Sequence, residues 1–260
     1  MLLEDKVVIV TGVGPGMGRK LAVLAAAEGA RVALAARSRG FLEDVAGEIR
    51  RAGGRCIAVP TDVGSEEDCG RLAACTVEAF GRIDGLVNSA YRPATFGAFE
   101  ADPLDAWIAS MDITCFGALR MTRAALPAMK ARGEGAIVNI TAMAAVQPAP
   151  GQADYATAKA ALEGATRQLA CELGRYRIRV NAARMGWLWG VPVQSYLRQQ
   201  AQACGRSEAE LAAPIAARIA LGVIPPDEEC ARTALLFVSD YTRMVTGAVL
   251  DVNGGEYLSS

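Results

Sequence analysis

Short apolar runs alternate with longer helical segments along the whole chain. The apolar runs predict strands at 6–10, 31–36, 56–59, 83–88, 136–141, 178–182 and 248–252. Ala- and Leu-rich stretches between them predict helices, one of which spans about 103–130 with a possible break near Pro127. Fully apolar strands that alternate with helices are typical of a parallel sheet covered on both faces.

The chain reads as one α/β domain over residues 1–260. It has 260 residues, of which 52% are hydrophobic, and this is enough to bury a substantial core. We find no internal repeat, low-complexity tract or linker. The partly helical insertion at about 186–225 follows the sixth predicted strand, and we expect it to form a lid over a substrate.

The net charge and the cysteine content indicate which binding partners and which cellular compartment to expect. The formal net charge is −1, which gives no reason to expect a nucleic acid or an anionic membrane as partner. No signal peptide is legible, and no uncharged apolar run reaches the roughly 18 residues of a membrane span. Seven scattered cysteines without a Cys-x-x-Cys pair indicate a reducing compartment, so we expect a cytoplasmic protein.

The chain contains no histidine. This excludes nucleophiles activated by histidine and metal sites ligated by histidine, and we expect no metal. Proton transfer must therefore use Tyr, Lys, Asp, Glu or Cys.

Tyr155 and Lys159 are four residues apart on a predicted helix, so they lie on one face. An ammonium beside a phenol favours the phenolate, and we expect Lys159 to lower the pKa of Tyr155. Such a pair can move a proton at an alcohol or carbonyl oxygen. In isolation the same spacing also fits an ordinary solvated helix face.

A glycine-rich loop joins the first predicted strand to the first helix. Gly12, Gly16 and Gly18 let the backbone approach a pyrophosphate, which would rest on the helix N-terminus. An ordinary tight turn is the alternative, but the strand–loop–helix context favours the binding role.

Five motifs follow one another in a recognisable order: Thr11-Gly-x-x-x-Gly16-x-Gly18, Asp62-Val63, Asn88-Ser-Ala90, Tyr155-x-x-x-Lys159 and Arg179-Val-Asn181. With these motifs the chain resembles the short-chain dehydrogenase/reductase family over nearly its whole length. The resemblance implies a single-domain Rossmann fold, doubly wound, with seven parallel strands. It also implies a nicotinamide dinucleotide as hydride carrier, and a homotetramer or homodimer built on the long helix and the Tyr155 helix.

The resemblance also assigns roles to individual residues. Tyr155 would be the catalytic proton donor or acceptor, and Lys159 would hold the nicotinamide ribose. The remaining positions that it implies for the dinucleotide are Gly12, Gly16, Met17 and Gly18 at the pyrophosphate, Asp62 and Val63 at adenine, Asn88 and Ala90 at the adenosine ribose, and Gly186 after the sixth strand.

The chain departs from the family pattern around this site. Ala142 stands where the family has its active-site serine, Thr114 where it has an asparagine, Tyr91 where a glycine is usual, Met185 before Gly186 where a proline is usual, and Gly190 where a threonine is usual. Losing one donor to the substrate oxygen typically costs about 10²–10³ in rate. Tyr91 could replace that donor, or could serve only as an aromatic wall. Thr141 is less suited, because strand alternation turns it to the opposite face.

The end of the second predicted strand bears on cofactor choice. Ala36 lies where NAD-preferring members carry an acidic residue, and Arg37 follows it. A guanidinium binds a 2′-phosphate bidentately, so Arg37 favours NADP, with NAD as the alternative. Pro15 occupies a loop position where many NADP-binding members have a second basic residue, and Arg37 could also be an ordinary surface arginine.

Large side chains near the site suggest the substrate. Tyr91, Met143, Trp187 and Trp189 would form an apolar wall for a bulky hydrophobic, aromatic or polycyclic ketone or alcohol, although lid packing explains the tryptophans equally well. Arg184 and Arg92 could meet a substrate carboxylate, but ion-pair or solvent roles are preferred.

Two functions remain open from the sequence. The first is an NAD(P)(H)-dependent oxidoreductase that interconverts a carbonyl and an alcohol on a small molecule. The second is a remodelled dinucleotide-binding protein with a non-reductase or regulatory role. Tyr155 and Lys159 favour the first, and the cluster of departures favours the second.

Overall fold

A computed structural model describes residues 1–259. Seven strands form one parallel sheet in the order β3-β2-β1-β4-β5-β6-β7. Their bounds are β1 Val7–Thr11, β2 Arg31–Ala36, β3 Arg55–Pro60, β4 Gly85–Asn88, β5 Gly135–Ala142, β6 Ile178–Met185 and β7 Val249–Val252. The predicted doubly wound Rossmann fold is confirmed.

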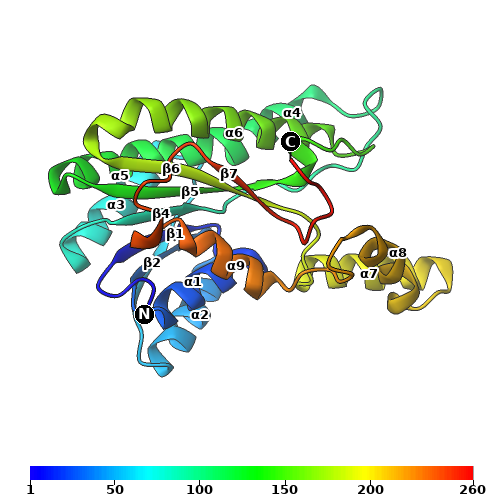
Figure 1. The fold of residues 1–260 in the computed structure, drawn as a ribbon, viewed down its shortest axis with the longest axis horizontal. Helices are drawn as coiled ribbons and strands as arrows, with labels where there is room; N and C mark the ends of the chain where they lie inside the picture. Colours follow the sequence, from blue (N-terminus) through cyan, green and yellow to red (C-terminus); the bar gives the residue numbers. More distant parts are fainter. Residues whose placement is uncertain (260) are drawn as a thin grey trace.

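Helices cover both faces of the sheet, as the apolar strands require (Figure 1). One layer contains α1 (Met17–Ala27), α2 (Arg39–Arg51) and α9 (Asp227–Leu236), and the other contains α3 (Glu66–Phe80), α5 (Gly117–Arg132) and α6 (Ala153–Leu173). Helix α4 (Leu104–Met111) packs on α6. Each layer buries its own apolar cluster against the strands.

The predicted long helix is interrupted, but not where the sequence suggested. A π-helix at Asp112–Phe116 joins α4 to α5, whereas Pro127 lies inside a continuous α5. The expected break near Pro127 is therefore wrong. A π-turn inserts an extra residue into the helix, and such turns are frequent at functional sites. Here it contains the buried Thr114.

Strand order creates a crevice beside β1. This strand pairs with β2 on one side and with β4 on the other, so the crossovers that leave the sheet from here diverge. Ligands of open α/β sheets bind at such a switch point, outside the carboxyl ends of the strands.

The insertion after β6 forms two helices, α7 (Val191–Cys204) and α8 (Glu208–Arg218), which stand to one side of the layers (Figure 1). A small apolar cluster centred on Leu197, Ile215 and Ile219 holds them together. Across residues 1–259, no helix combines the length and apolar character needed to cross a membrane.

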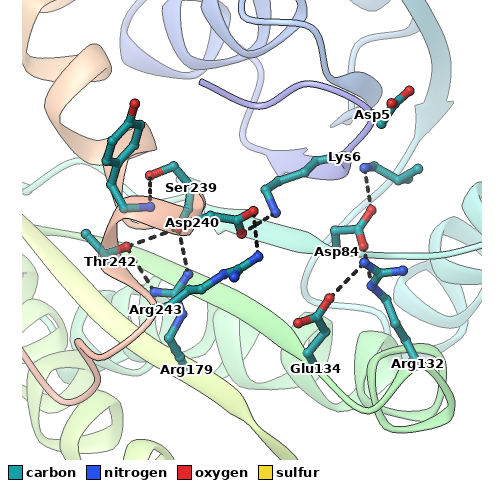
Figure 2. A network of polar contacts seen from close by, with 12 residues as sticks. Asp5, Lys6, Asp84, Arg132, Glu134, Arg179, Ser239, Asp240, Thr242 and Arg243 are labelled. Carbon is teal, nitrogen blue, oxygen red and sulfur yellow. Dashed lines mark hydrogen bonds and ion pairs between the residues drawn. The ribbon is translucent and has the colours of Figure 1, made fainter. Parts of the chain in front are cut away.

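A polar network ties the strands together at their amino ends (Figure 2). The Asp84 carboxylate accepts hydrogen bonds from the Val7 amide at 2.7 Å and from Arg82 Nε at 2.8 Å, and it pairs with Arg132 Nε at 2.6 Å. Asp84 is buried, and these groups belong to β1, α5 and the turn before β4. One carboxylate thus joins three separate segments.

We expect Asp84→Asn to lower the free energy of unfolding by about 2–3 kcal/mol, because it leaves two guanidinium groups without their buried carboxylate. Urea denaturation measures the change. The control is Asp240→Asn, which removes an ion pair with Lys6 from a side chain that is 55% exposed and should cost less than about 1 kcal/mol. Equal losses in the two variants would contradict the role given to Asp84.

Candidate functional site

A cavity of about 350 Å³ opens at the carboxyl ends of the central strands. Segments from six parts of the chain line it: the loop residues Gly12, Gly14, Pro15, Gly16, Met17 and Gly18; Ser89 and Tyr91 after β4; Ile140, Thr141 and Ala142 of β5; Tyr155 and Lys159 of α6; Met185, Gly186, Leu188, Gly190, Pro192 and Val193; and Asp227. The structure thus brings the glycine-rich loop and the Tyr155–Lys159 pair to one space.

The glycine-rich loop has the form of an anion cradle. Gly12 has φ +68°, and a Cβ there would lie 2.5 Å from Ala90 Cα. A Cβ at Gly18 would collide with the carbonyl oxygen of Gly12, so the loop folds tightly onto the start of α1. The first turn of α1 carries Arg19 and Lys20 and begins with free amide groups, which favour an anion. The loop therefore fits a dinucleotide pyrophosphate.

Tyr155 and Lys159 lie one turn apart on α6. Lys159 is buried, and its Nζ donates a hydrogen bond of 2.6 Å to the carbonyl oxygen of Ile140 in β5. The same Nζ lies 5.6 Å from the centroid of the Tyr155 ring. Strand β5 therefore fixes the ammonium, and α6 fixes the distance from it to the phenol.

Burial dominates the protonation of this pair. It raises the pKa of Tyr155 above its usual range and lowers the pKa of Lys159 to about 7, against an opposing effect of the Glu163 carboxylate. The pKa of Tyr155 is therefore not lowered in this arrangement, contrary to the expectation from Lys159. The physical reason is that loss of hydration disfavours both charged forms, and the neighbouring Tyr91 adds to the effect on Tyr155.

A buried charge network lies one turn further along α6. The Glu163 carboxylate receives two hydrogen bonds from Arg184 of β6, at 2.8 and 2.7 Å, and Arg184 also pairs with Asp251 of β7 at 2.9 Å. The side chains of Arg184 and Glu163 are 7% and 4% exposed, so these are interior contacts. Arg184 thus has the ion-pair role preferred from the sequence, whereas Arg92 is exposed.

The wall opposite Tyr155 lacks the hydroxyl usual in the family. Ala142 lines the cavity with a methyl group. The neighbouring Thr141 donates its hydroxyl to Glu163 Oε1 at 3.0 Å, so that hydroxyl is already engaged. No hydroxyl of these two residues therefore faces a substrate oxygen.

Tyr91 stands beside Tyr155. The two rings meet edge to face, with centroids 5.9 Å apart and planes at 63°. Lys159 Nζ lies 5.4 Å from the Tyr91 centroid, close to its distance from Tyr155. Two phenols therefore share one buried ammonium at the mouth of the cavity.

Three other candidate substrate residues do not line the cavity. Trp187 packs against Tyr196 at 6.1 Å between centroids, and it joins the apolar cluster of the lid helices. Trp189 bridges to Pro226, and Met143 begins a short 3-10 turn after β5. Of the proposed apolar wall, Tyr91 lines the cavity, whereas Trp187 packs with the cluster of α7 and α8 and Trp189 is 37% exposed.

Several residues of the cavity escaped the sequence reasoning, and Asp227 and Pro192 are two of them. Asp227 lies at the start of α9, and a Cβ at Gly190 would be 2.5 Å from its Oδ2 atom. Pro192 lies over the loop, with its Cγ 3.1 Å from where a Gly16 Cβ would be. The missing side chain at Gly190 was a signal that another group occupies that space.

The candidate residues for the adenosine half lie outside this cavity. Arg37 is exposed after β2, and Asp62 and Val63 follow β3, where the Asp62 carboxylate accepts from the Gly64 amide. Asn88 is buried, and its side-chain amide donates a hydrogen bond of 2.9 Å to Asn139 Oδ1. The next residue, Ser89, lines the cavity. Ala90 packs against Gly12, and Gly186 against Asn253.

The described part of the chain contains no set of side chains that could bind a metal ion. No three side chains among Cys, Asp and Glu gather within it at ligand distance. The chemistry present is instead two phenols, one ammonium and a cradle for an anion.

Comparisons with known proteins agree with this geometry. A family described as enoyl-(acyl carrier protein) reductase matches residues 12–256. The short-chain reductase protein NovJ of Streptomyces niveus is 34% identical, over 97% of this chain and 94% of its own. The 2,5-dichloro-2,5-cyclohexadiene-1,4-diol dehydrogenase of Sphingobium indicum (strain DSM 16412) is also 34% identical, over 97% of both chains.

Solved structures show the same likeness. A variant of actinorhodin polyketide ketoreductase, determined with NADPH, superposes with a TM-score of 0.89 at 32% identity and covers 96% of this chain and 97% of its own. With its Tyr155-x-x-x-Lys159 pair and its glycine-rich loop in one crevice, the chain belongs to the short-chain dehydrogenase/reductase family, whose members act on CH–OH and C=O groups.

Proposed function

We propose that the protein is an NADP(H)-dependent oxidoreductase that interconverts a carbonyl and an alcohol on a hydrophobic small molecule. One observation carries the proposal: a single cavity has the glycine-rich loop on one wall and Tyr155 with Lys159 on another. An anion cradle and a proton donor in one crevice are what hydride transfer to a carbonyl requires.

In the reductive direction, Tyr155 donates its proton to the substrate oxygen. Lys159, held by the Ile140 carbonyl, stabilises the phenolate that this leaves. The nicotinamide supplies the hydride when it is bound. Gly12, Gly16, Met17 and Gly18 would hold its pyrophosphate, and Lys159 its nicotinamide ribose. The walls of the cavity exclude water from the reacting centre.

Arg37 supports NADP over NAD. It is exposed directly after β2, and Ala36 before it carries no carboxylate that would repel a 2′-phosphate. Asp62 and Val63 after β3 would border adenine, with Asn88 and Ala90 at the adenosine ribose. NADPH is also the dinucleotide in the ketoreductase structure described above.

The cavity walls favour an apolar substrate. Ile140, Ala142, Leu188 and Val193 present hydrocarbon to it, and Tyr91 adds an aromatic face. The names of the relatives include a cyclic diol dehydrogenase and a polyketide ketoreductase. We therefore propose an alicyclic or aromatic ketone, or the matching alcohol, as substrate.

Exposed apolar residues on the surface support the formation of a homo-oligomer. Leu104 and Ile108 of α4 are each 66% exposed, and Phe116 at the end of the π-helix is 47% exposed. These residues lie on the long helical segment that packs on α6, where we propose a homodimer or homotetramer interface.

A second function is favoured by Ala142. Without a hydroxyl on that wall, the site could bind a dinucleotide yet not reduce an ordinary carbonyl. Dinucleotide binding without turnover on any ketone would support this regulatory or non-reductase role.

We expect the protein to oxidise NADPH with hydrophobic ketones, and Tyr155→Phe to lower kcat at least about 10²-fold because the proton donor is lost. The loss of NADPH absorbance measures the rate with a panel of alicyclic and aryl ketones. Tyr196→Phe, in the lid, is the matched control and should keep its activity. Equal rates for Tyr155→Phe and the unaltered protein would remove Tyr155 from the mechanism.

Arg37→Ala should weaken NADPH binding roughly 10-fold or more and leave NADH binding nearly unchanged, because only NADPH has the 2′-phosphate. Fluorescence titration gives both dissociation constants. Arg51→Ala, at the far end of α2, removes the same charge from an exposed site and should affect neither. If Arg37→Ala weakens both dinucleotides equally, the phosphate assignment is wrong.

The buried ammonium should also make stability depend on pH. The pKa of Lys159 is about 7 in the folded protein and about 10.4 when unfolded, so the unfolded chain binds more protons between these values. Folding stability should therefore rise with pH across this window.

Relative to Lys159→Met, the unaltered protein should gain roughly 2–3 kcal/mol of unfolding free energy between pH 6 and pH 9.5. Urea denaturation at both pH values, without dinucleotide, measures the gain. Lys130→Met, at an exposed position, should show no such difference. Parallel pH curves for Lys159→Met and the unaltered protein would contradict the depressed pKa.

A further inference from the structure

The cavity has two phenols where the family pattern provides one phenol and a serine. Ala142 offers only a methyl group, and the Thr141 hydroxyl is bonded to Glu163. Tyr91 and Tyr155 both line the cavity, from the end of β4 and from α6.

We propose that the Tyr91 hydroxyl is the second hydrogen-bond donor to the substrate oxygen, in place of the hydroxyl missing at Ala142. This inference rests on the proposed function and adds a catalytic residue to it.

The position of Tyr91 supports this role. Its ring centroid is 5.9 Å from that of Tyr155, the planes meet edge to face at 63°, and both side chains line the same cavity. Lys159 Nζ is 5.4 Å from one centroid and 5.6 Å from the other. Because both side chains line one cavity, we expect a substrate oxygen that receives the Tyr155 proton to lie within reach of Tyr91 as well.

The protonation of Tyr91 also suits a donor. Tyr91 is 46% exposed, and its partial burial raises the pKa of the phenol, so it keeps its proton at neutral pH and can donate a hydrogen bond. A donor aimed at a developing oxyanion is typically worth about 10²–10³ in rate.

The backbone on both sides of Tyr91 is anchored. The amide of Arg92 donates to Thr114 Oγ1 at 3.1 Å, and the amide of Ser89 donates to Thr11 Oγ1 at 3.2 Å. Thr114 is fully buried in the π-helix, so this contact is rigid. Thr114 is a positioning residue, since it acts on the substrate only through Tyr91. A donor held in place needs no reorganisation during the reaction.

The proposed step is balanced. A bound dinucleotide would supply the hydride to the carbonyl carbon, and the Tyr155 proton would pass to the oxygen. Tyr91 keeps its own proton and lends only a hydrogen bond, which strengthens as charge builds on the oxygen.

The first test uses kinetics with NADPH and a bicyclic aromatic ketone such as 1-tetralone. Tyr91→Phe should lower kcat about 10²-fold and leave the KM for NADPH unchanged. Adding Ala142→Ser to Tyr91→Phe should restore at least about 10-fold, because a hydroxyl returns to the opposite wall. Tyr196→Phe is again the control. An unchanged kcat in Tyr91→Phe, with turnover lost in Tyr155→Phe, would overturn this inference and leave the proposed function standing.

Thr114 gives a second kinetic test. Thr114→Val should lower kcat in the unaltered protein but have little further effect in Tyr91→Phe, because both changes act on one donor. Thr114→Ser keeps the hydroxyl and should retain the rate. Equal losses from Thr114→Val with and without Tyr91 would overturn the positioning role.

A third test needs no turnover. A ketone labelled with ¹³C at its carbonyl, bound with NADP⁺, should show its infrared carbonyl stretch at lower frequency than in hexane. Tyr91→Phe should reverse part of that shift, since one hydrogen bond is lost. The same stretch in both proteins would overturn the inference. Bound NADP⁺ without any bound ketone would overturn both the inference and the reductase function.

Discussion

One buried ammonium constrains the whole site. Among the described residues, Lys159 donates one hydrogen bond, to the Ile140 carbonyl. It is buried deeply enough that its pKa falls to about 7. A charge so placed is tolerated only beside groups that stabilise it, and two phenol rings stand within 6 Å of it. The end of β5, the helix α6 and the loop of Tyr91 must all keep their places to hold it.

The neighbouring charges explain why this ammonium is not simply paired. Glu163 lies one turn from Lys159 on the same helix, which is the usual spacing of an ion pair. Arg184 binds that carboxylate through two hydrogen bonds, and Asp251 neutralises the second side of Arg184. The acid is therefore satisfied by β6 and β7, and Lys159 remains directed at the cavity. Thr141 takes part in the same network, which is why its hydroxyl is lost to the substrate.

The sequence predicted the fold well because the apolar strands leave little choice. Strands with no polar face must be covered on both sides, and short loops between alternating elements then produce the doubly wound sheet. The helix of Tyr155 and Lys159 was predicted for the same reason. The π-turn at Thr114 was missed because it depends on packing around one residue. Pro127 is recognisable in the sequence as a possible helix break, but tertiary contacts keep the helix continuous there.

The site was harder to predict where distant segments meet. Trp187 and Trp189 looked like substrate contacts because they follow a strand that ends at the cavity. Trp187 instead packs with the apolar cluster of α7 and α8, and Trp189 pairs through its backbone with Pro226. Asp227 reaches the cavity across about 40 residues of chain, into space left by Gly190, and no local pattern announces such a contact. The acidity of Tyr155 was misjudged because charge attraction is visible in sequence spacing, while desolvation depends on depth.

The departures from the family pattern are physically coupled. A tyrosine at position 91 needs a fixed backbone to act as a donor. The Thr114 hydroxyl fixes that backbone, because it accepts a hydrogen bond from the Arg92 amide. An asparagine at position 114 would bind this amide with a different geometry. A methyl group at 142 leaves the opposite wall open for the phenol of Tyr91. Of the three, Ala142 removes a hydroxyl from the site, Tyr91 adds one where the family has a glycine, and Thr114 keeps a hydroxyl that binds the Arg92 amide. Taken together they exchange a hydroxyl on β5 for a hydroxyl after β4, so the oxygen of a bound carbonyl still faces two donors. A more aromatic cavity wall is the consequence, and it favours flat, apolar ketones over small polar ones.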